Sequence, residues 1–213
     1  IYGENMLPLT HSDYFTTSGH GDNWKVHLKS CTQEPNSFHN ECIRAAKILY
    51  ESASSPIVLL FSGGLDSEYM INIFKKAGID FKVAIISYGA YNTHDTAYAF
   101  EYCNAHSISP IIIDVDIDKF ITSGKIIEIA TTAKCCAYQI PSIMYGISKI
   151  DGTVIMANGE PYIKNFDGDW RWEETERVNS YMNWFRDQRL EGTPDFLRYT
   201  PEMTAGFLKE PRV

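Results

Sequence analysis

The chain has 213 residues, of which 44% are hydrophobic and 22% are charged, and its formal net charge is −8 at pH 7. This length and composition are typical of one large globular domain with short extensions, which buries enough apolar surface to fold without staples. The acidic balance argues against binding along a nucleic-acid backbone or to an anionic membrane surface, because both require many Lys and Arg contacts.

The five cysteines indicate a reducing compartment. Their number is odd and no two are spaced as CxxC, whereas secreted disulfide frameworks pair their cysteines. No apolar run reaches the ~20 residues that a membrane helix needs. We therefore expect a cytoplasmic protein with no membrane partner.

The order of elements along the chain indicates alternating strands and helices. Residues 1–35 are interpreted as an N-terminal extension with a short edge strand at 24–28. Continuous apolar runs, typical of strands buried on both faces, are then separated by stretches of helical periodicity. The predicted strands are 57–61, 81–86, 111–113 and 153–156, and the predicted helices are 38–53, 66–78, 93–106 and 125–147, the last interrupted at Pro141.

Strands joined by crossover helices predict a parallel sheet with helices on both faces. The predicted fold class is α/β, a three-layer α/β/α arrangement around a parallel sheet of about five strands. Residues 36–164 form this domain, and 165–213 are interpreted as a C-terminal helical cap or lid. Ligands of such sheets bind at the carboxyl ends of the strands. The site is therefore expected around 62–67, 87–91, 114–118 and 158–164.

The segment from Ser62 to Ser67, Ser-Gly-Gly-Leu-Asp-Ser, lies between the first of these strands and its helix. Gly63 and Gly64 permit backbone angles and close approach that side chains would prevent, and their N–H groups can form an anion-binding concavity. The following helix directs its positive end at the same place. Asp66 would repel a phosphate unless Mg²⁺ lies between them. A tight turn with an Asp or Ser helix cap is the alternative, although the strand–loop–helix context favours a phosphate site.

This segment resembles the PP-loop of the N-type ATP pyrophosphatases. That superfamily includes asparagine synthetase, GMP synthetase, NAD synthetase, the queuosine-precursor nitrile synthases, and tRNA-modifying ligases and thiolases. Residues 57–160 are covered by the resemblance. Looser similarity to the nitrile-synthase branch lies at 86–89, followed by His94, Asp95 and Ala99, and at 156–160. That branch carries a cysteine-rich zinc cluster near its end, whereas no cysteine follows Cys136 in this sequence, which weakens assignment to that branch.

The resemblance implies a HUP/Rossmann-like, adenine nucleotide alpha-hydrolase-like fold and two ligands, ATP and Mg²⁺. A substrate oxygen would attack the α-phosphate of ATP, giving an adenylated substrate and pyrophosphate, and a nucleophile such as ammonia or a thiol would then displace AMP. By resemblance, the catalytic residues are Asp66, Ser62 and Lys164, the metal ligands are Asp66 and Glu160, and the nucleotide-binding residues are Ser62, Gly63, Gly64, Leu65, Asp66, Ser67, Leu60, Phe61, Ser87, Tyr88 and Gly159.

Several polar residues keep two interpretations. Glu160 is equally well a metal ligand or a loop cap, and Arg171 is either a phosphate clamp or a solvated charge. The three aspartates of 114–118 are spaced like a calcium loop, but Lys119 replaces its required Gly. Capping of a helix by Asp116 or Asp118 is the favoured interpretation.

Three functions remain open. The first is an AMP-forming ligase that activates a small molecule and uses free ammonia or a separate nitrogen- or sulfur-donor protein. The second is a relative that acts on tRNA or adenylylsulfate, for which acidity is unfavourable and Cys103 is the nominated reactive thiol. The third is a non-catalytic nucleotide-binding module. A homodimer is compatible with each.

Overall fold

A computed structural model describes residues 15–18, 25–135, 137–159, 162–173 and 176–210. The predicted alternation of strands and helices is confirmed between residues 38 and 156, with the local differences described below. The elements are β1 Phe15–Ser18, β2 Lys25–Leu28, α1 Phe38–Ser52, β3 Ile57–Leu60, α2 Leu65–Lys76, β4 Lys82–Ser87, a 3₁₀ turn Gly89–Asn92, α3 Thr93–Ala105, β5 Ile111–Asp114, α4 Ile117–Thr122, α5 Lys125–Ala133, α6 Ile140–Ile147, β6 Thr153–Ile155, β7 Tyr162–Phe166, β8 Asp169–Glu173, α7 Glu176–Asp187, β9 Gly192–Thr193, a 3₁₀ turn Phe196–Arg198 and α8 Pro201–Lys209.

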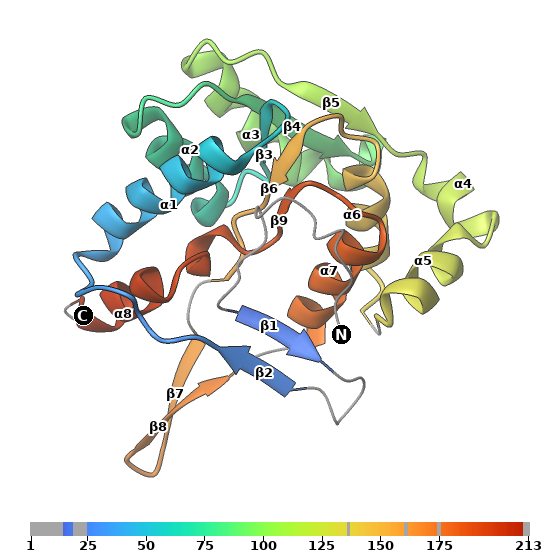
Figure 1. The fold of residues 1–213 in the computed structure, drawn as a ribbon. Helices are drawn as coiled ribbons and strands as arrows, with labels where there is room; N and C mark the ends of the chain where they lie inside the picture. The colour runs from blue at the N-terminus through green and yellow to red at the C-terminus, as the bar shows by residue number, and fades with distance from the viewer. Residues whose placement is uncertain (1–14, 19–24, 136, 160–161, 174–175, 211–213) are drawn as a thin grey trace.

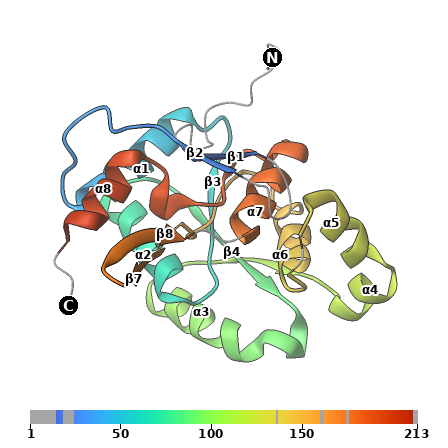
Figure 2. The ribbon, with the colours of Figure 1, turned by 90° about the horizontal axis from the view of Figure 1, so that it is seen from below.

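The main sheet has five parallel strands in the order β5-β4-β3-β6-β9, with β3 at its centre. Helices α1, α2, α3 and α8 cover one face, and α4 to α7 lie on the other side (Figures 1 and 2). The expected three-layer α/β/α fold is therefore confirmed. Because all five strands run the same way, their carboxyl ends lie along one edge of the sheet.

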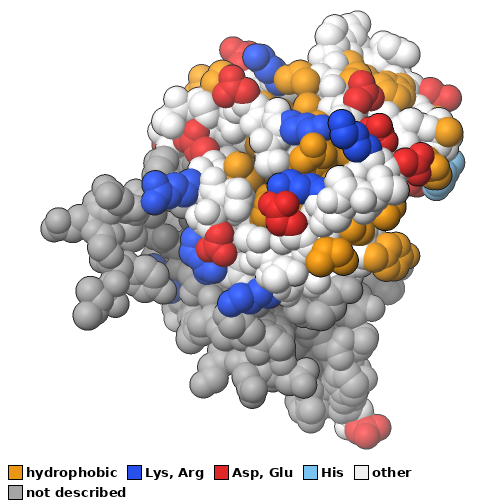
Figure 3. Space-filling model, turned by 90° about the vertical axis from the view of Figure 1, so that its right-hand side faces the viewer, with side chains coloured by type: hydrophobic (Ala, Val, Ile, Leu, Met, Phe, Trp, Pro, Cys, Tyr) orange, Lys and Arg blue, Asp and Glu red, His pale blue; other side chains and the backbone are white. Residues whose placement is uncertain are grey.

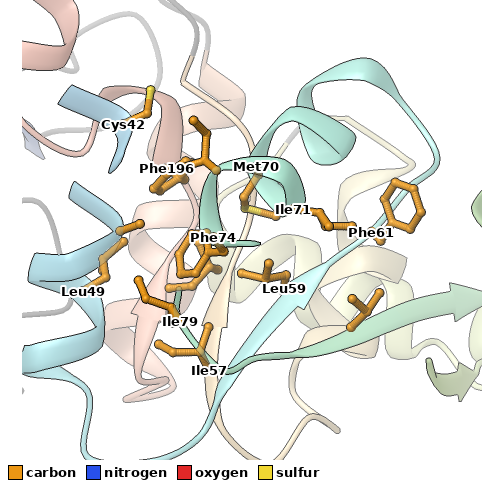
Figure 4. Close-up of a cluster of buried hydrophobic side chains, with 14 of the residues drawn as sticks. Cys42, Leu49, Ile57, Leu59, Phe61, Met70, Ile71, Phe74, Ile79 and Phe196 are labelled. Carbon is orange, nitrogen blue, oxygen red and sulfur yellow. The ribbon is translucent and has the colours of Figure 1, made fainter. Parts of the chain in front are cut away.

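Two apolar cores hold the layers together, one on each face of the sheet. Along β3 the side chains alternate, so that Ile57, Leu59 and Phe61 enter the core under α1 and α2 while Val58 enters the other. Figure 4 shows the first of these cores, in which Phe74 and Phe196 lie close to the β3 side chains. Burial on both faces explains why the β3 sequence is continuously apolar.

The tail of the chain contributes more to the sheet than its interpretation as a cap suggested. The strand β9 pairs with β6, and the following Phe196, Leu197 and Met203 are buried in the core under α1 and α2. Before it, β7 and β8 form an antiparallel hairpin around Asp167 and Gly168, both of which have positive φ angles. Positive φ at both central residues is the geometry that Asp-Gly turns favour.

Three further differences from the sequence interpretation are local. The long helix expected over 125–147 is two helices, because Lys134 ends α5 in the left-handed conformation and Pro141 occupies the first turn of α6. Helix α4 was not predicted. Its N-cap is Asp116, whose side chain accepts a hydrogen bond from Lys119 N at 2.9 Å, which confirms the capping interpretation. The edge strand predicted at 24–28 is β2, which pairs with β1 outside the main sheet.

At the amino ends of the strands, polar groups are bonded to one another. The Glu191 carboxylate accepts hydrogen bonds from Ser54 N at 2.5 Å and from the hydroxyls of Ser54 and Ser55. Thr153 Oγ1 donates to Ser55 O at 3.1 Å. We call these four residues the amino-edge cluster. It joins β9 to the loop before β3. Among the described helices, none is long and apolar enough to span a bilayer.

Candidate functional site

The site begins where β3 ends and the chain turns sharply into α2. We call residues 62–67, which make this turn, the corner. Gly63 has φ +83°, and a Cβ built there would lie 2.8 Å from the Asp95 carbonyl oxygen of α3. Residue 63 therefore has to be Gly both for its backbone angle and for its close approach to α3. Gly64 is the N-cap of α2 and has no capping side chain. The first N–H groups of α2 are thus left for a ligand, and the helix dipole favours an anion there.

Two serine hydroxyls brace this corner from inside. Ser67 is buried, and its Oγ donates to Gly64 O at 2.9 Å. The same Oγ lies 3.1 Å from Ser62 Oγ and accepts from Ser62 N at 3.4 Å. Ser62 Oγ in turn accepts from Gly64 N at 3.4 Å. These bonds hold the loop in one shape before any ligand arrives, which lowers the entropic cost of binding.

A cavity of about 610 Å³ opens beside the corner. Its volume falls in the range of small-molecule sites. Most of the expected nucleotide-binding residues line it, together with side chains of α3, α6, α7 and the segment after β6. The lining residues are Leu60, Phe61, Ser62, Gly63, Gly64, Asp66, Ser67, Ile86, Tyr88, Asn92, His94, Asp95, Thr96, Tyr98, Ile143, Met156, Ala157, Asn158 and Tyr181.

The remaining expected residues lie elsewhere. Leu65 is 84% exposed and does not line the cavity. Ser87 lines a second cavity of about 350 Å³ formed with the loop after β5. Gly159 is packed so closely against Arg198 that a Cβ at residue 159 would lie 2.6 Å from Arg198 Cγ. Lys164 belongs to β7, where it pairs with Arg171 of β8, and Glu160 lies outside the described residues.

The acidic and histidine side chains described in the cavity lining are Asp66, Asp95 and His94. Asp66 is exposed in the first turn of α2, and His94 Nε2 lies 3.2 Å from Asp95 Oδ1. Within the described parts of the chain, no three His, Cys, Asp or Glu side chains are grouped to hold a metal by themselves. This arrangement fits Mg²⁺, which is held by one or two carboxylates together with substrate phosphates and water.

The wall opposite the corner is built by the loop after β4. The Tyr88 hydroxyl lies 3.0 Å from Ser142 Oγ of α6, and burial raises the pKa of Tyr88 more than this hydrogen bond lowers it. The phenol is therefore neutral and provides a fixed, mostly apolar surface. Tyr98, at the rim, donates to Glu68 Oε2 at 2.6 Å.

Cys103, the thiol nominated for a reductase, is in the wrong environment for that chemistry. It is 1% exposed in α3, and burial raises the pKa of its thiol while the nearby Lys75 lowers it less. A reactive cysteine needs a lowered pKa and access to solvent. The free cysteines of the described chain are Cys31, Cys42, Cys103 and Cys135.

Sequence reasoning missed five contributors to the cavity: Asn92, Thr96, Tyr98, Ile143 and Tyr181. Asn92 and Tyr98 lie within a stretch assigned to a loop and a helix, and only the packing of α3 against the corner brings them to the site. Ile143 and Tyr181 come from α6 and α7, far along the chain. A hydrophobic pattern identifies the buried face of a helix but not which cavity that face borders.

The fold and the corner define the chain as an α/β protein with a cavity at the carboxyl edge of its parallel sheet. No family model and no curated protein matches it. Among solved structures it is similar to the NH3-dependent NAD synthetase from Campylobacter jejuni subsp. jejuni NCTC 11168 in complex with the nitrate ion, with 17% identity and a TM-score of 0.43 over 58% of this chain and 56% of that one.

A second similar structure is that of a predicted subunit of tRNA methyltransferase from Methanocaldococcus jannaschii DSM, with 14% identity and a TM-score of 0.43 over 71% of this chain and 72% of that one. Of the two structures, the NAD synthetase is matched over little more than half of its length. Similarity at this level carries no conclusion about activity. The resemblance to the PP-loop superfamily rests on the Ser62–Ser67 segment and on its position in the observed fold.

Proposed function

We propose that the chain is an ATP-dependent adenylating enzyme of the PP-loop ATP pyrophosphatase class, which converts ATP to AMP and pyrophosphate while activating a small-molecule acceptor. The observation that carries this proposal is the glycine corner between β3 and α2, which borders the 610 Å³ cavity. The corner is also accessible to a ligand. Here Ser62, Gly64 and Asp66 are exposed.

The corner supplies the groups that a triphosphate requires. The N–H groups at the start of α2 and the hydroxyl of Ser62 can donate to phosphate oxygens, and the helix dipole adds favourable charge. Asp66 lies in the same turn and would hold Mg²⁺ against those oxygens, with Glu160 as the second proposed ligand. Bound Mg²⁺ would neutralise charge that develops on the phosphates.

The proposed reaction is a displacement at the α-phosphorus. An acceptor oxygen forms a bond to the α-phosphorus, and the bond from that phosphorus to the bridging oxygen breaks, so that pyrophosphate leaves with the electron pair. The corner holds the pyrophosphate through its N–H donors and hydroxyls, and Lys164 is the proposed cation for the leaving group. A separate nucleophile, such as ammonia, then displaces AMP from the acceptor.

The alternative functions have less support. The adenylylsulfate-reductase alternative requires an accessible thiol, and the nominated Cys103 is buried. For a tRNA substrate, a continuous basic surface would be expected. On the face that Figure 3 shows, Lys and Arg side chains of the described residues are interspersed with Asp and Glu. A non-catalytic binding module is distinguished by experiment.

The test is product analysis of the purified chain with ATP, Mg²⁺ and an ammonium salt as the nucleophile, across a panel of small carboxylates and amides. Pyrophosphate and AMP are expected in equal amounts with at least one acceptor. Asp66→Ala should lower the rate at least about 100-fold, as loss of a group that stabilises developing charge does. Release of ADP and inorganic phosphate would overturn the proposed class, and ATP binding without any product would indicate the binding module.

The matched control is Asp80→Ala. Asp80 is also an exposed carboxylate, but it precedes β4 and so lies at the opposite edge of the sheet. Its substitution should leave the rate within about twofold of the wild type, because screened surface charges act weakly at this distance. An equal loss in both variants would show that net charge, and not the position of Asp66, determines activity.

A further inference from the structure

The ladder between β3 and β4 stops where β3 turns into the corner. The two strands are in register through Leu60 and Ala84, and Phe61 N donates to Ala84 O at 2.8 Å. Continuing this register would place Gly63 opposite Ser87, where its backbone would bond to Ile86 O and Tyr88 N. Gly63 instead turns away toward α3. Two backbone groups at the end of β4, Ile86 O and Tyr88 N, would therefore be left without a partner from β3.

Asn92 fills this gap with its side chain. Its Nδ2 donates to Ile86 O at 3.0 Å, and its Oδ1 accepts from Tyr88 N at 2.7 Å. The amide of Asn92 thus takes the place of the missing β3 peptide. Both atoms have an assigned partner of the correct kind, so the orientation of the amide is determined by the network.

Helix capping does not explain the Asn at this position. Asn92 is the N-cap of α3, a position where Asn usually accepts a hydrogen bond from the first turn of the helix. Here the side chain makes no such bond, and only the Asn92 carbonyl is used locally, as the acceptor for Thr96 Oγ1 at 3.0 Å. The side chain is committed to the end of β4 instead. It is half-buried and lines the cavity.

We propose that Asn92 is a positioning residue for nucleoside binding: it seals the break between β3 and β4, fixes the Tyr88 wall, and occupies the single hydrogen-bond donor of Tyr88 N. This inference rests on the proposed function for the identity of the ligand. The base is then held by contact with the apolar lining, which includes Leu60, Ile143 and Met156. While the Asn92 bond persists, Tyr88 N cannot donate a hydrogen bond to the edge of the base.

The first experiment needs no ATP. Amide hydrogen exchange of Tyr88, measured by NMR at residue resolution, should be about tenfold faster in Asn92→Ala than in the wild type, because the acceptor is lost. Asn92→Asp keeps that acceptor and loses the donor to Ile86 O, so Tyr88 should stay protected. The matched control Asn104→Ala changes an exposed Asn of the same helix and should leave Tyr88 exchange unaltered. Unchanged Tyr88 exchange in Asn92→Ala would overturn the proposal.

The second experiment uses nucleotide. In Asn92→Ala the KM for ATP should rise about tenfold while kcat for pyrophosphate release stays within about twofold, since the corner is untouched. The thermal midpoint, compared with that of Asn104→Ala, checks that folding is retained. An ATP affinity equal to or tighter than that of the wild type would show that the freed backbone groups bind the base, and would overturn the proposal. If the wild type binds no ATP, the proposed function fails, whereas the exchange experiment still decides the role of Asn92.

Discussion

The two edges of the sheet use the same kinds of residue for opposite purposes. Each has a pair of serines, glycines at positive φ and an acidic side chain. In the amino-edge cluster the carboxylate of Glu191 is bonded by Ser54 and Ser55. At the corner, the carboxylate of Asp66 is exposed and has no hydrogen-bond partner among the described residues. Polar groups that are bonded internally stabilise the fold, whereas those left open are available to a ligand.

This difference predicts that substitutions at the two edges separate activity from stability. Variants of the corner should lose activity, with or without a loss of stability. Variants of the amino-edge cluster should lose stability alone. Three predictions test this contrast, beginning with the largest effect.

Gly63→Ala should damage both properties. A non-Gly residue at φ +83° is strained, and the added Cβ would meet the Asp95 carbonyl oxygen at 2.8 Å. We expect the free energy of unfolding to fall by about 2 kcal/mol or more, and pyrophosphate release to fall more than about tenfold because the corner is displaced. Urea unfolding and the product assay measure the two effects.

Gly78→Ala is the matched control for Gly63→Ala. Gly78 also has a positive φ, +69°, but nothing lies within 4 Å of an added Cβ. Backbone strain alone should cost about 1 kcal/mol there, with activity unchanged. Equal losses of stability in the two variants would show that the contact with Asp95 contributes nothing.

Glu191→Gln should reduce stability and leave activity intact. The variant weakens charge-assisted hydrogen bonds from Ser54 and Ser55, which we expect to lower the free energy of unfolding by about 1–2 kcal/mol. The corner is at the other end of β3, so the rate of pyrophosphate release in the folded protein should match the wild type. A fall in rate without a change in the unfolding midpoint would contradict the separation of the two edges.

The smallest expected effect is an acid dependence of stability. Burial alone would raise the pKa of Glu191, but hydrogen bonds from Ser55 and Ser54 outweigh it and lower the pKa from 4.5. A carboxyl whose folded pKa is lowered contributes stability above its unfolded pKa, and this contribution is lost as pH falls through the folded value. Stability should therefore be level above about pH 6 and decline below about pH 4.5.

Glu191→Gln should make this decline shallower. Part of the decline will remain in the variant, because hydrogen bonds from Asn36 and Arg44 also lower the pKa of Glu41 against its burial. Identical pH profiles for the variant and the wild type, measured by urea unfolding at several pH values, would show that Glu191 does not contribute to the acid transition.

The central part of the fold could be predicted because its pattern is strong. Continuous apolar runs such as 57–60 and helical stripes such as 65–76 reflect burial, which sequence periodicity records directly. The corner could be predicted as well, since its glycines and serines lie together in the chain. Asp66 and the loop around it are placed at the cavity by β3 and α2 alone.

The elements that escaped prediction are short or depend on distant partners. Strand β9 has two residues, too few to show any alternation. Helix α4 has six residues, less than two turns. The β7–β8 hairpin does carry a local signal, because the Asp167-Gly168 pair is flanked by aromatic residues. The role of Asn92 follows from the break in the β3–β4 ladder, and no sequence pattern marks such a break.

The position of β9 has a consequence for how the protein is made. Its two residues, Gly192 and Thr193, cover the outer edge of β6, yet they follow the other four strands of the sheet in the chain. On the ribosome, the nascent chain will therefore present an uncovered strand edge until residues 192–193 emerge, which is the situation in which strands associate wrongly. We expect nascent chains cut off before Gly192 to depend on chaperones, although every residue of the corner is already present in them.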